Sequence, residues 1–239
     1  LRYDWFESDD RPNFNQAFTT ANGGLRNDTN IDGLDLLMPR LGFTWEANYN
    51  LTVRGGAGLY SGGNPNVWIS NAWSNDGLTN VQLQNRNFSG ARSIFSDWTL
   101  SGAGRPGYDV PQEMIDQVAN TTADSANDSF LVVIDPNYEQ PSEWKLALGG
   151  TYTFDSGLSV DADFLYSIAN DAAYYVDVSQ EQIGVTTTGQ PIFDYATGRD
   201  NFMLTNSDRD AKSTSFSLVA RHDYDFGLDW MVGYAFTDA

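Results

Sequence analysis

Cysteine is absent from this sequence of 239 residues, and histidine occurs only once. Without cysteine, the chain has no disulfide framework and no thiolate chemistry. A single histidine also leaves few ways to build a transition-metal site, so we expect neither a metal nor a cofactor. Cations are scarce as well, because 13 lysine and arginine residues face 32 aspartate and glutamate residues, a net charge of −19. This balance argues against nucleic acid as a partner, since neutralising phosphates requires clustered cations.

Long hydrophobic runs are lacking too. The longest uninterrupted aliphatic run is Leu131-Val132-Val133-Ile134, whereas a transmembrane helix needs about 20 apolar residues. The mean hydropathy of −0.42 argues against a helical membrane protein but suits a β-barrel, whose polar lumen and loops dilute its apolar face. Aromatic residues make up 14% of the chain and glycines number 22, while helix signals are few. This composition is typical of an all-β protein.

The clearest pattern lies in residues 142–168, where two stretches of strict alternation meet at Asp155-Ser156-Gly157. Apolar and aromatic residues fill one face of each stretch, and small or polar residues fill the other. Each stretch runs 11 to 13 residues, about twice the usual length of a strand in a soluble sheet. A tilted strand needs about 9–11 residues to cross the core of a bilayer. The pattern therefore predicts two neighbouring strands in the wall of a transmembrane β-barrel.

Further alternating stretches extend this pattern along the chain. The predicted strands lie near residues 1–8, 40–48, 52–60, 142–154, 158–168, 214–224 and 228–237. Three long connections separate them, residues 9–39, 61–141 and 169–213, and the second contains a predicted short helix at 111–119. Tight turns on one side and long loops on the other are typical of outer-membrane barrels. The predicted fold class is therefore all-β, an antiparallel transmembrane β-barrel section of about seven long strands with short periplasmic turns and long extracellular loops.

The tight turns predict how the strands pair. Asp155-Ser156-Gly157 and Asp225-Phe226-Gly227 each place glycine third, as in a type I turn closed by a left-handed residue. A three-residue turn around Asn50 is also expected, although Asn50 fits that geometry less well. These turns predict the following cross-strand pairs: Glu46 with Arg54, Trp45 with Gly55, Phe43 with Ala57, Tyr152 with Val160, Leu148 with Phe164, Phe216 with Phe236, Leu218 with Tyr234, and Asp223 with Asp229.

Charged residues on the polar strand faces are predicted to point into the barrel lumen. They are Arg2, Asp4, Glu46, Arg54, Glu143, Lys145, Asp161, Asp163, Arg221, Asp223 and Asp229. Pairing between neighbours explains them best, and contact with a plug or a substrate path is the functional alternative. Asp161 and Asp163 share one strand face with no pocket implied, so they do not match the flanking carboxylates of a glycosidase. We therefore expect no enzymatic activity.

Two loop segments are candidate binding sites. Asp28, Asp32 and Asp35 supply carboxylates that could hold calcium, but their spacing lacks the EF-hand order and favours a solvated loop. Residues 60–73 combine glycines, amides and aromatic rings at the start of the longest loop. Aromatic and amide surfaces suit peptides or sugars, so we predict ligand contacts there, with loop packing as the alternative. The residues chosen are Asn64, Asn66, Trp68 and Trp73.

Several segments resemble TonB-dependent receptors. Residues 135–145 (DPNYEQPSEWK) resemble the stretch that leads from an extracellular loop into the barrel of those receptors. Residues 39–45 (PRLGFTW), 53–68 (VRGGAGLYSGGNPNVW) and 233–239 (GYAFTDA) look more like the Oar-like branch, and residues 160–175 fit the same pattern. The resemblance covers nearly the whole chain in order. It implies an outer-membrane protein of a Gram-negative bacterium that binds an extracellular ligand and imports it.

The resemblance also implies partners beyond this sequence. The family barrel has 22 strands and an N-terminal plug with a TonB box, so we expect this chain to be an internal section of a barrel. Its partners would be outer-membrane lipid, the TonB system through the missing N-terminal region, and an unknown extracellular ligand. Two alternatives stay open: a passive porin-type channel, and a soluble acidic β-sandwich that binds carbohydrate. A sandwich would usually have shorter strands facing a second sheet.

Overall fold

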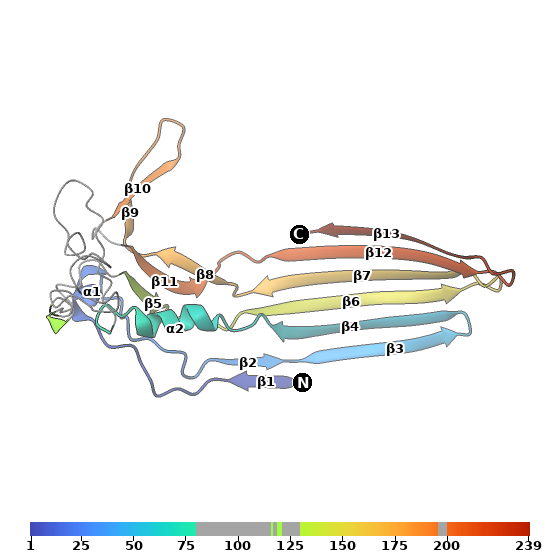
Figure 1. The fold of residues 1–239 in the computed structure, drawn as a ribbon, viewed down its shortest axis with the longest axis horizontal. Coiled ribbons are helices and arrows are strands. Elements are labelled where there is room, and N and C mark those ends of the chain that lie inside the picture. Colours follow the sequence, from blue (N-terminus) through green and yellow to red (C-terminus); the bar gives the residue numbers. More distant parts are fainter. Residues whose placement is uncertain (80–115, 117–118, 121–129, 196–199) are drawn as a thin grey trace, which may run out of the picture.

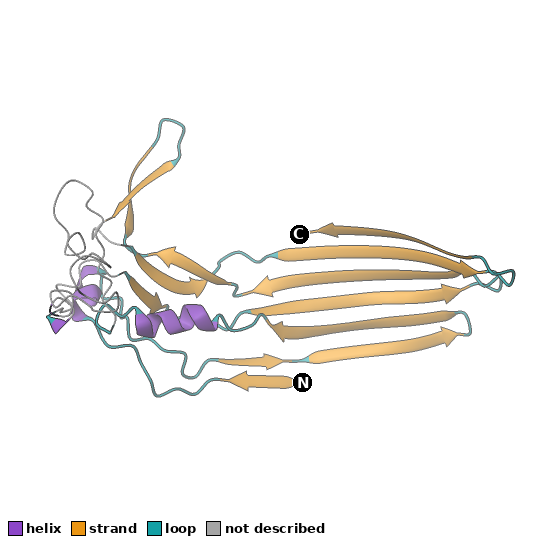
Figure 2. Cartoon of the chain, in the orientation of Figure 1, coloured by secondary structure: helices purple, strands orange, loops and turns teal. Residues whose placement is uncertain are grey.

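The computed structural model describes residues 1–79, 116, 119–120, 130–195 and 200–239 (Figure 1). Most of the helix predicted at 111–119 and much of the predicted loop 61–141 therefore lie outside the described residues. Figure 2 shows a long sheet of strands at one end and a cluster of shorter elements at the other. The fold is mainly antiparallel β structure, which confirms the predicted class.

Six strands form the long sheet, in the order β13-β12-β7-β6-β4-β3, and every neighbouring pair is antiparallel. They are β3 (Arg40–Asn48), β4 (Leu51–Ser61), β6 (Ser142–Thr153), β7 (Ser159–Asn170), β12 (Lys212–Asp223) and β13 (Asp229–Asp238). Each lies within a few residues of a strand predicted from the alternation. Their lengths of 9 to 12 residues match the about 9–11 residues that a tilted strand needs to cross a bilayer.

Two of the three tight turns have the predicted geometry. Gly157 and Gly227 have φ angles of 88° and 91°, in the left-handed region that glycine enters without a steric cost. In the first turn the Gly157 amide donates to the Phe154 carbonyl at 2.9 Å, and the Gly227 amide makes the same bond to Tyr224 in the second. The predicted pairs of these two hairpins are confirmed: Tyr152 with Val160, Leu148 with Phe164, Phe216 with Phe236, Leu218 with Tyr234, and Asp223 with Asp229.

The predicted register of the β3–β4 hairpin is wrong. Asn48 pairs with Leu51, so the turn has two residues rather than three. A bulge at Ala47 lies just before this turn, at the end of β3. Arg54 therefore lies opposite Thr44 instead of Glu46, while Trp45 lies opposite Val53 and Phe43 opposite Gly55. The shift is two residues along β3. Because side chains alternate with a period of two, each residue keeps its predicted face.

The predicted long loops contain further strands. Strand 1–8 is shorter than predicted, because β1 (Arg2–Trp5) ends at Trp5 and pairs with β2 (Asp35–Met38), inside predicted loop 9–39. The remaining elements of the described loops are α1 (Gln16–Ala21), α2 (Asn66–Ser74), β5 (Leu131–Ile134), β8 (Ala173–Asp177), β9 (Gln180–Val185), β10 (Pro191–Tyr195) and β11 (Asn201–Asn206). These strands have only four to six residues, too few for alternation to stand out from the sequence.

The buried core of the described residues lies mainly in what we term the loop-side unit, which comprises α1, α2, β5, β8 and β11. Strand β11 pairs with β5 in parallel and with β8 in antiparallel orientation. One apolar cluster joins Ile69 and Ala72 of α2 to Ile134 and Leu204, and a second joins Phe18 of α1 to Val133. The aliphatic run of β5 is buried on both faces, which explains why its sequence does not alternate.

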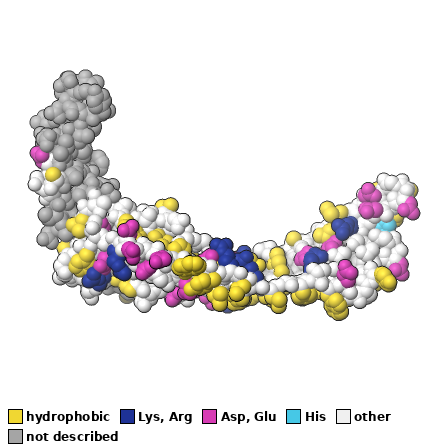
Figure 3. Space-filling model, turned by 90° about the horizontal axis from the view of Figure 1, so that it is seen from below, with side chains coloured by type: hydrophobic (Ala, Val, Ile, Leu, Met, Phe, Trp, Pro, Cys, Tyr) yellow, Lys and Arg dark blue, Asp and Glu magenta, His cyan; other side chains and the backbone are white. Residues whose placement is uncertain are grey.

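The long sheet has two contrasting faces. The outward face is apolar. One of its rows contains Val53, Gly150, Ala162, Leu218 and Tyr234, and the rows beside it are apolar as well. On this face the side chain of Trp144 is 44% exposed and that of Leu148 is 53% exposed. In Figure 3, which views the sheet edge-on at right, the lysines and arginines of this part lie towards the upper edge, and hydrophobic side chains line the lower edge with smaller groups on the upper one. Among the described residues, no second sheet covers the outward face. Such a large exposed apolar surface indicates contact with lipid or a partner. No helix in the described ranges is long and apolar enough to cross a membrane.

Candidate functional site on the inner face of the sheet

The inner face of the long sheet carries most of the charged side chains of this sheet. The pairing register of the strands aligns these side chains in rows across the sheet. One row runs from Thr44 through Arg54, Gly149 and Asp163 to Ser217. The next row towards the loop-side unit contains Gly42, Gly56, Ala147, Leu165 and Ser215, and the one beyond it contains Arg40, Gly58, Lys145, Ser167 and Ser213. Charges from distant parts of the sequence therefore meet on one surface.

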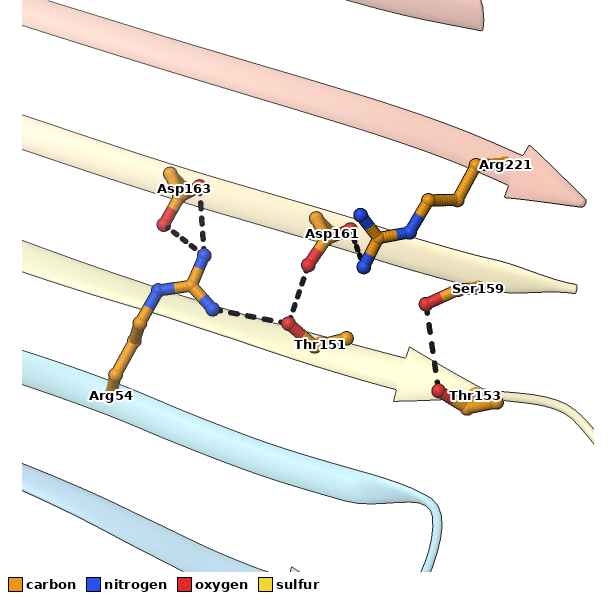
Figure 4. Close-up of polar contacts among 7 residues, drawn as sticks. All are labelled: Arg54, Thr151, Thr153, Ser159, Asp161, Asp163 and Arg221. Atoms are coloured by element: carbon orange, nitrogen blue, oxygen red, sulfur yellow. Dashed lines mark hydrogen bonds and ion pairs between the residues drawn. The ribbon is translucent and has the colours of Figure 1, made fainter. Parts of the chain in front are cut away.

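Arg54 and Asp163 form the central ion pair of this face. The Arg54 Nη2 atom lies 2.9 Å and 3.0 Å from the two carboxylate oxygens of Asp163, across the intervening strand β6 (Figure 4). The residue between them on β6 is Gly149, and a Cβ atom there would clash with Asp163 Oδ1. The absence of a side chain at Gly149 therefore lets the two charged groups meet.

Hydrogen bonds extend this pair into a network over four strands. Arg54 Nη1 donates to Thr151 Oγ1 at 3.0 Å, and the Thr151 hydroxyl donates in turn to Asp161. Arg221 of β12 completes the chain, with its Nη2 atom 3.6 Å from Asp161 (Figure 4). Four of the predicted lumen charges are thus brought together. The two arginines and two aspartates of this network are partly exposed to solvent, and their ion pairs can help to hold the strands in register. Because the two positive and two negative charges balance, the network has no net charge.

A second group, which we term the Arg40 cluster, consists of Arg40, Tyr60 and Lys145. The guanidinium carbon of Arg40 lies 4.1 Å from the centre of the Tyr60 ring, and Lys145 Nζ lies 5.8 Å from the same ring centre. An open hollow of about 630 Å³ separates this cluster from the Arg54–Asp163 pair. Small residues line the hollow between the two groups: Gly42, Gly56, Ala147 and Gly149.

Glu143 joins the edge of the Arg40 cluster, because its carboxylate lies 2.9 Å from Lys145 Nζ. The remaining predicted charges lie apart from both groups. Arg2 contacts Asp4 at 2.8 Å. Glu46 lies opposite Thr52 rather than Arg54. Asp223 and Asp229 face each other at the turn end of the β12–β13 hairpin, as predicted.

The acidic residues of predicted loop 9–39 bind separate partners. Asp28 pairs with Arg26, whose hydrogen bond lowers the pKa of the Asp28 carboxyl. Asp32 accepts a hydrogen bond from the Ser8 amide at 3.1 Å, and Asp35 accepts one from the Tyr3 hydroxyl at 2.8 Å. Within the described residues, no group of three acidic or histidine side chains could hold a metal ion.

The four predicted loop residues lie on or just before helix α2. Asn64 accepts a hydrogen bond from Gln140, and Asn66 is the first residue of the helix. Trp68 stacks on Tyr175 with ring centres 4.9 Å apart, and its carbonyl accepts a bond from the Tyr175 hydroxyl. Burial raises the pKa of Tyr175, against a hydrogen bond to Asn71 that lowers it. Trp73 packs against the core cluster of the loop-side unit. Ligand binding by these residues stays a prediction.

Sequence reasoning missed Arg40, Tyr60 and Gly149. Arg40 is the first residue of the predicted strand 40–48, and the alternation places it on the same face as Gly42 and Thr44. The predicted register sets Arg40 opposite Tyr60, whereas in the structure Arg40 lies opposite Gly58 and reaches the Tyr60 ring diagonally. Gly149 has no signal of its own, because its importance arises from the ion pair that crosses it.

A family model described as an outer membrane beta barrel domain matches residues 2–239. The chain belongs to this family. Among solved structures, the outer membrane transporter YddB from Escherichia coli is similar, with 14% sequence identity and a TM-score of 0.46. That likeness covers 86% of this chain but 20% of YddB, so the chain spans a small part of that protein's length. No curated protein matches the sequence.

Membership of this family explains the two faces of the long sheet. The strands of an outer-membrane barrel turn apolar residues towards lipid and polar residues towards the interior. The outward face with Trp144 and Leu148 is therefore the lipid face. The Arg54 network, the Arg40 cluster and the hollow between them lie on the interior wall.

Proposed function

We propose that this chain is a section of the barrel of a TonB-dependent transporter of the Oar-like type. In this proposal the protein binds a ligand at the cell surface and imports it, with energy supplied by the TonB system through a region outside this sequence. The chain catalyses no covalent chemistry. The elements described here would supply part of the wall and part of the ligand-binding surface.

The observation that carries the proposal is the combination of a barrel wall with a substantial folded unit at its loop end. The loop-side unit has its own buried core and presents Trp68 partly exposed, stacked on Tyr175. Residues 135–145, which resemble the receptor segment entering the barrel, run from the end of β5 into β6 and connect the unit to the wall. A folded surface unit at the mouth of a barrel suits ligand capture more than free diffusion.

Conductance of the full-length protein separates a transporter from a passive porin. After reconstitution into planar lipid bilayers, a plugged transporter should show no steady open-channel current, whereas a porin would show stable conductance steps. The second arm measures binding of the purified periplasmic domain of TonB to the full-length protein. The proposal expects a closed pore and saturable TonB binding. Steady conductance without TonB binding would contradict it and favour the porin.

A further inference from the structure

We propose that the Arg40 cluster is an anion-binding site on the interior wall, which takes a carboxylate or phosphate group of a solute that passes through the barrel. This inference rests on the proposed transport function and adds the chemical class of the cargo group. The site comprises Arg40 and Lys145 as the cationic groups, Tyr60 as their platform, and the glycine-lined hollow beside them.

The geometry of Arg40 is fixed by its surroundings. The guanidinium lies over the Tyr60 ring, its Nη2 atom lies 3.9 Å from Met38 Sδ, and its Nε atom contacts the Leu59 carbonyl at 3.4 Å. Gly58 makes this arrangement possible, because a Cβ atom there would lie 2.9 Å from Arg40 Cγ and 3.2 Å from Tyr60 Cε2. An arginine stacked on an aromatic ring keeps its N–H groups directed outward in the plane of the guanidinium. Because Nε contacts the Leu59 carbonyl, the Nη1 and Nη2 groups are the ones that can bind an oxyanion in bidentate fashion.

The charge of the cluster is unbalanced. Among the described residues, no carboxylate lies within ion-pair distance of Arg40. Lys145 is balanced by Glu143, so the cluster keeps one net positive charge. By contrast, Arg54 and Arg221 of the neighbouring network each have a carboxylate partner. The positive charge of the cluster is thus a local excess in a chain whose net charge is −19. Figure 3 shows cationic side chains gathered midway along the molecule.

The hollow provides room for a bound group. Gly42 and Gly56 lie in the row directly beside Arg40 and Gly58, and both line the hollow. Its volume of about 630 Å³ exceeds what an isolated phosphate or carboxylate needs, so the remainder of a solute can lie along the wall. The inner face also excludes lipid head groups as the source of the anion, because lipid contacts the opposite face.

The absence of cysteine from this chain permits a direct test by thiol labelling in the full-length protein, with any cysteine elsewhere replaced by serine. Gly42→Cys places a thiol in the hollow, where the nearest heavy atom to a new Cβ is 3.7 Å away. Ser215→Cys is the matched control, because Ser215 lies in the same row of the inner face, on β12. In the first measurement, the labelling rates of each variant with an anionic and with a cationic methanethiosulfonate are compared. In the second, the labelling rate with a neutral methanethiosulfonate is measured as inorganic phosphate is added.

We expect the ratio of anionic to cationic labelling rates to be about tenfold higher at Gly42→Cys than at Ser215→Cys, as one unbalanced charge nearby implies. Phosphate should slow neutral labelling saturably at Gly42→Cys alone, and Arg40→Gln with Lys145→Gln should abolish both effects. Equal rate ratios, or no protection by either phosphate or acetate, would overturn the proposal even if the double variant fails to fold. Repeating the protection assay with acetate identifies a carboxylate preference. These readouts need neither TonB nor import, so they fail independently of the proposed function.

Discussion

At the scale of single residues, Gly149 determines whether the central ion pair of the inner face can form. We expect Gly149→Ala to destabilise the barrel by about 1–3 kcal/mol, a range typical of substitutions that break a polar network. The new methyl group would clash with Asp163 Oδ1, so it must displace the carboxylate from Arg54. The measurement is the unfolding free energy of the full-length protein in lipid vesicles.

Gly42→Ala is the control for this substitution, because its methyl group meets only an ordinary contact at 3.7 Å. Adding Asp163→Ala to Gly149→Ala should cost less than the sum of the two single substitutions, since both remove the same ion pair. If Gly149→Ala proves as mild as Gly42→Ala, the ion pair does not cross β6 as described.

Asp76 provides a second prediction, in the turn after helix α2. Its buried carboxylate accepts hydrogen bonds from the Thr79 hydroxyl, the amides of Leu78 and Thr79, and the Asn13 side chain. Burial opposes ionisation most strongly, but these bonds together outweigh it and lower the pKa of Asp76. The native pKa thus lies below the unfolded value of about 3.9. This stabilisation is present above about pH 4 and is lost as the pH falls through the native pKa.

Hydrogen exchange can measure this dependence. The Val132 amide of β5 donates to the Asn75 carbonyl, next to Asp76, so its protection reports on the turn. We expect Asp76→Asn to reduce that protection at pH 6 by about 1–2 kcal/mol, the loss of charge-assisted bonds. The variant should also show a smaller decrease in protection below pH 4 than the wild type. Equal pH profiles for both proteins would refute the role of the Asp76 charge.

At the scale of elements, strand β7 offers neighbours on opposite faces at the same depth. Phe164 points outward and Leu165 inward, although both are exposed in this structure. We expect Phe164→Arg to cost about 2–4 kcal/mol, because it places a charge near the midplane of the bilayer, and Leu165→Arg to cost little. Folding free energies in lipid vesicles test this difference. Similar costs for the two variants would mean that the outward face does not contact lipid.

The hairpins also show how far local sequence determines the sheet. Asp155-Ser156-Gly157 and Asp225-Phe226-Gly227 contain glycine where the turn requires a left-handed residue, so turn length, pairing and register followed from the sequence. The β3–β4 turn lacks such a glycine, and a two-residue turn with a bulge at Ala47 replaced the predicted one. The faces were still predicted correctly, because the error was an even number of residues.

The loop-side unit was not predictable in the same way. Strands β5, β8 and β11 gain stability from helix α2 and from each other rather than from their own pattern. The aliphatic run of β5 was visible in the sequence, but its parallel partner β11 is 70 residues away in the chain. The Arg40 cluster was missed for a different reason, because a cation–π contact depends on side-chain rotamers, which the alternation of the strands does not specify.

At the scale of the whole molecule, two parts bury apolar surface in different ways. The loop-side unit buries side chains such as Val133 within its own core, whereas the long sheet leaves Trp144 and Leu148 uncovered. In water such a sheet would associate or aggregate. In an outer membrane, lipid covers this face, and the charged inner face remains hydrated. The central claim is therefore that the two faces of the sheet contact different solvents.

Site-directed spin labelling of β7 tests this claim most directly. Cysteines would be introduced one at a time into the full-length protein in lipid vesicles, at Ser159, Val160, Ala162, Phe164, Leu165, Tyr166 and Ser167. Labels at 160, 162, 164 and 166 should be accessible to oxygen in the lipid, and labels at 159, 165 and 167 to a water-soluble nickel complex. This period of two is the predicted result. Equal access of the nickel complex to both sets would contradict a barrel wall.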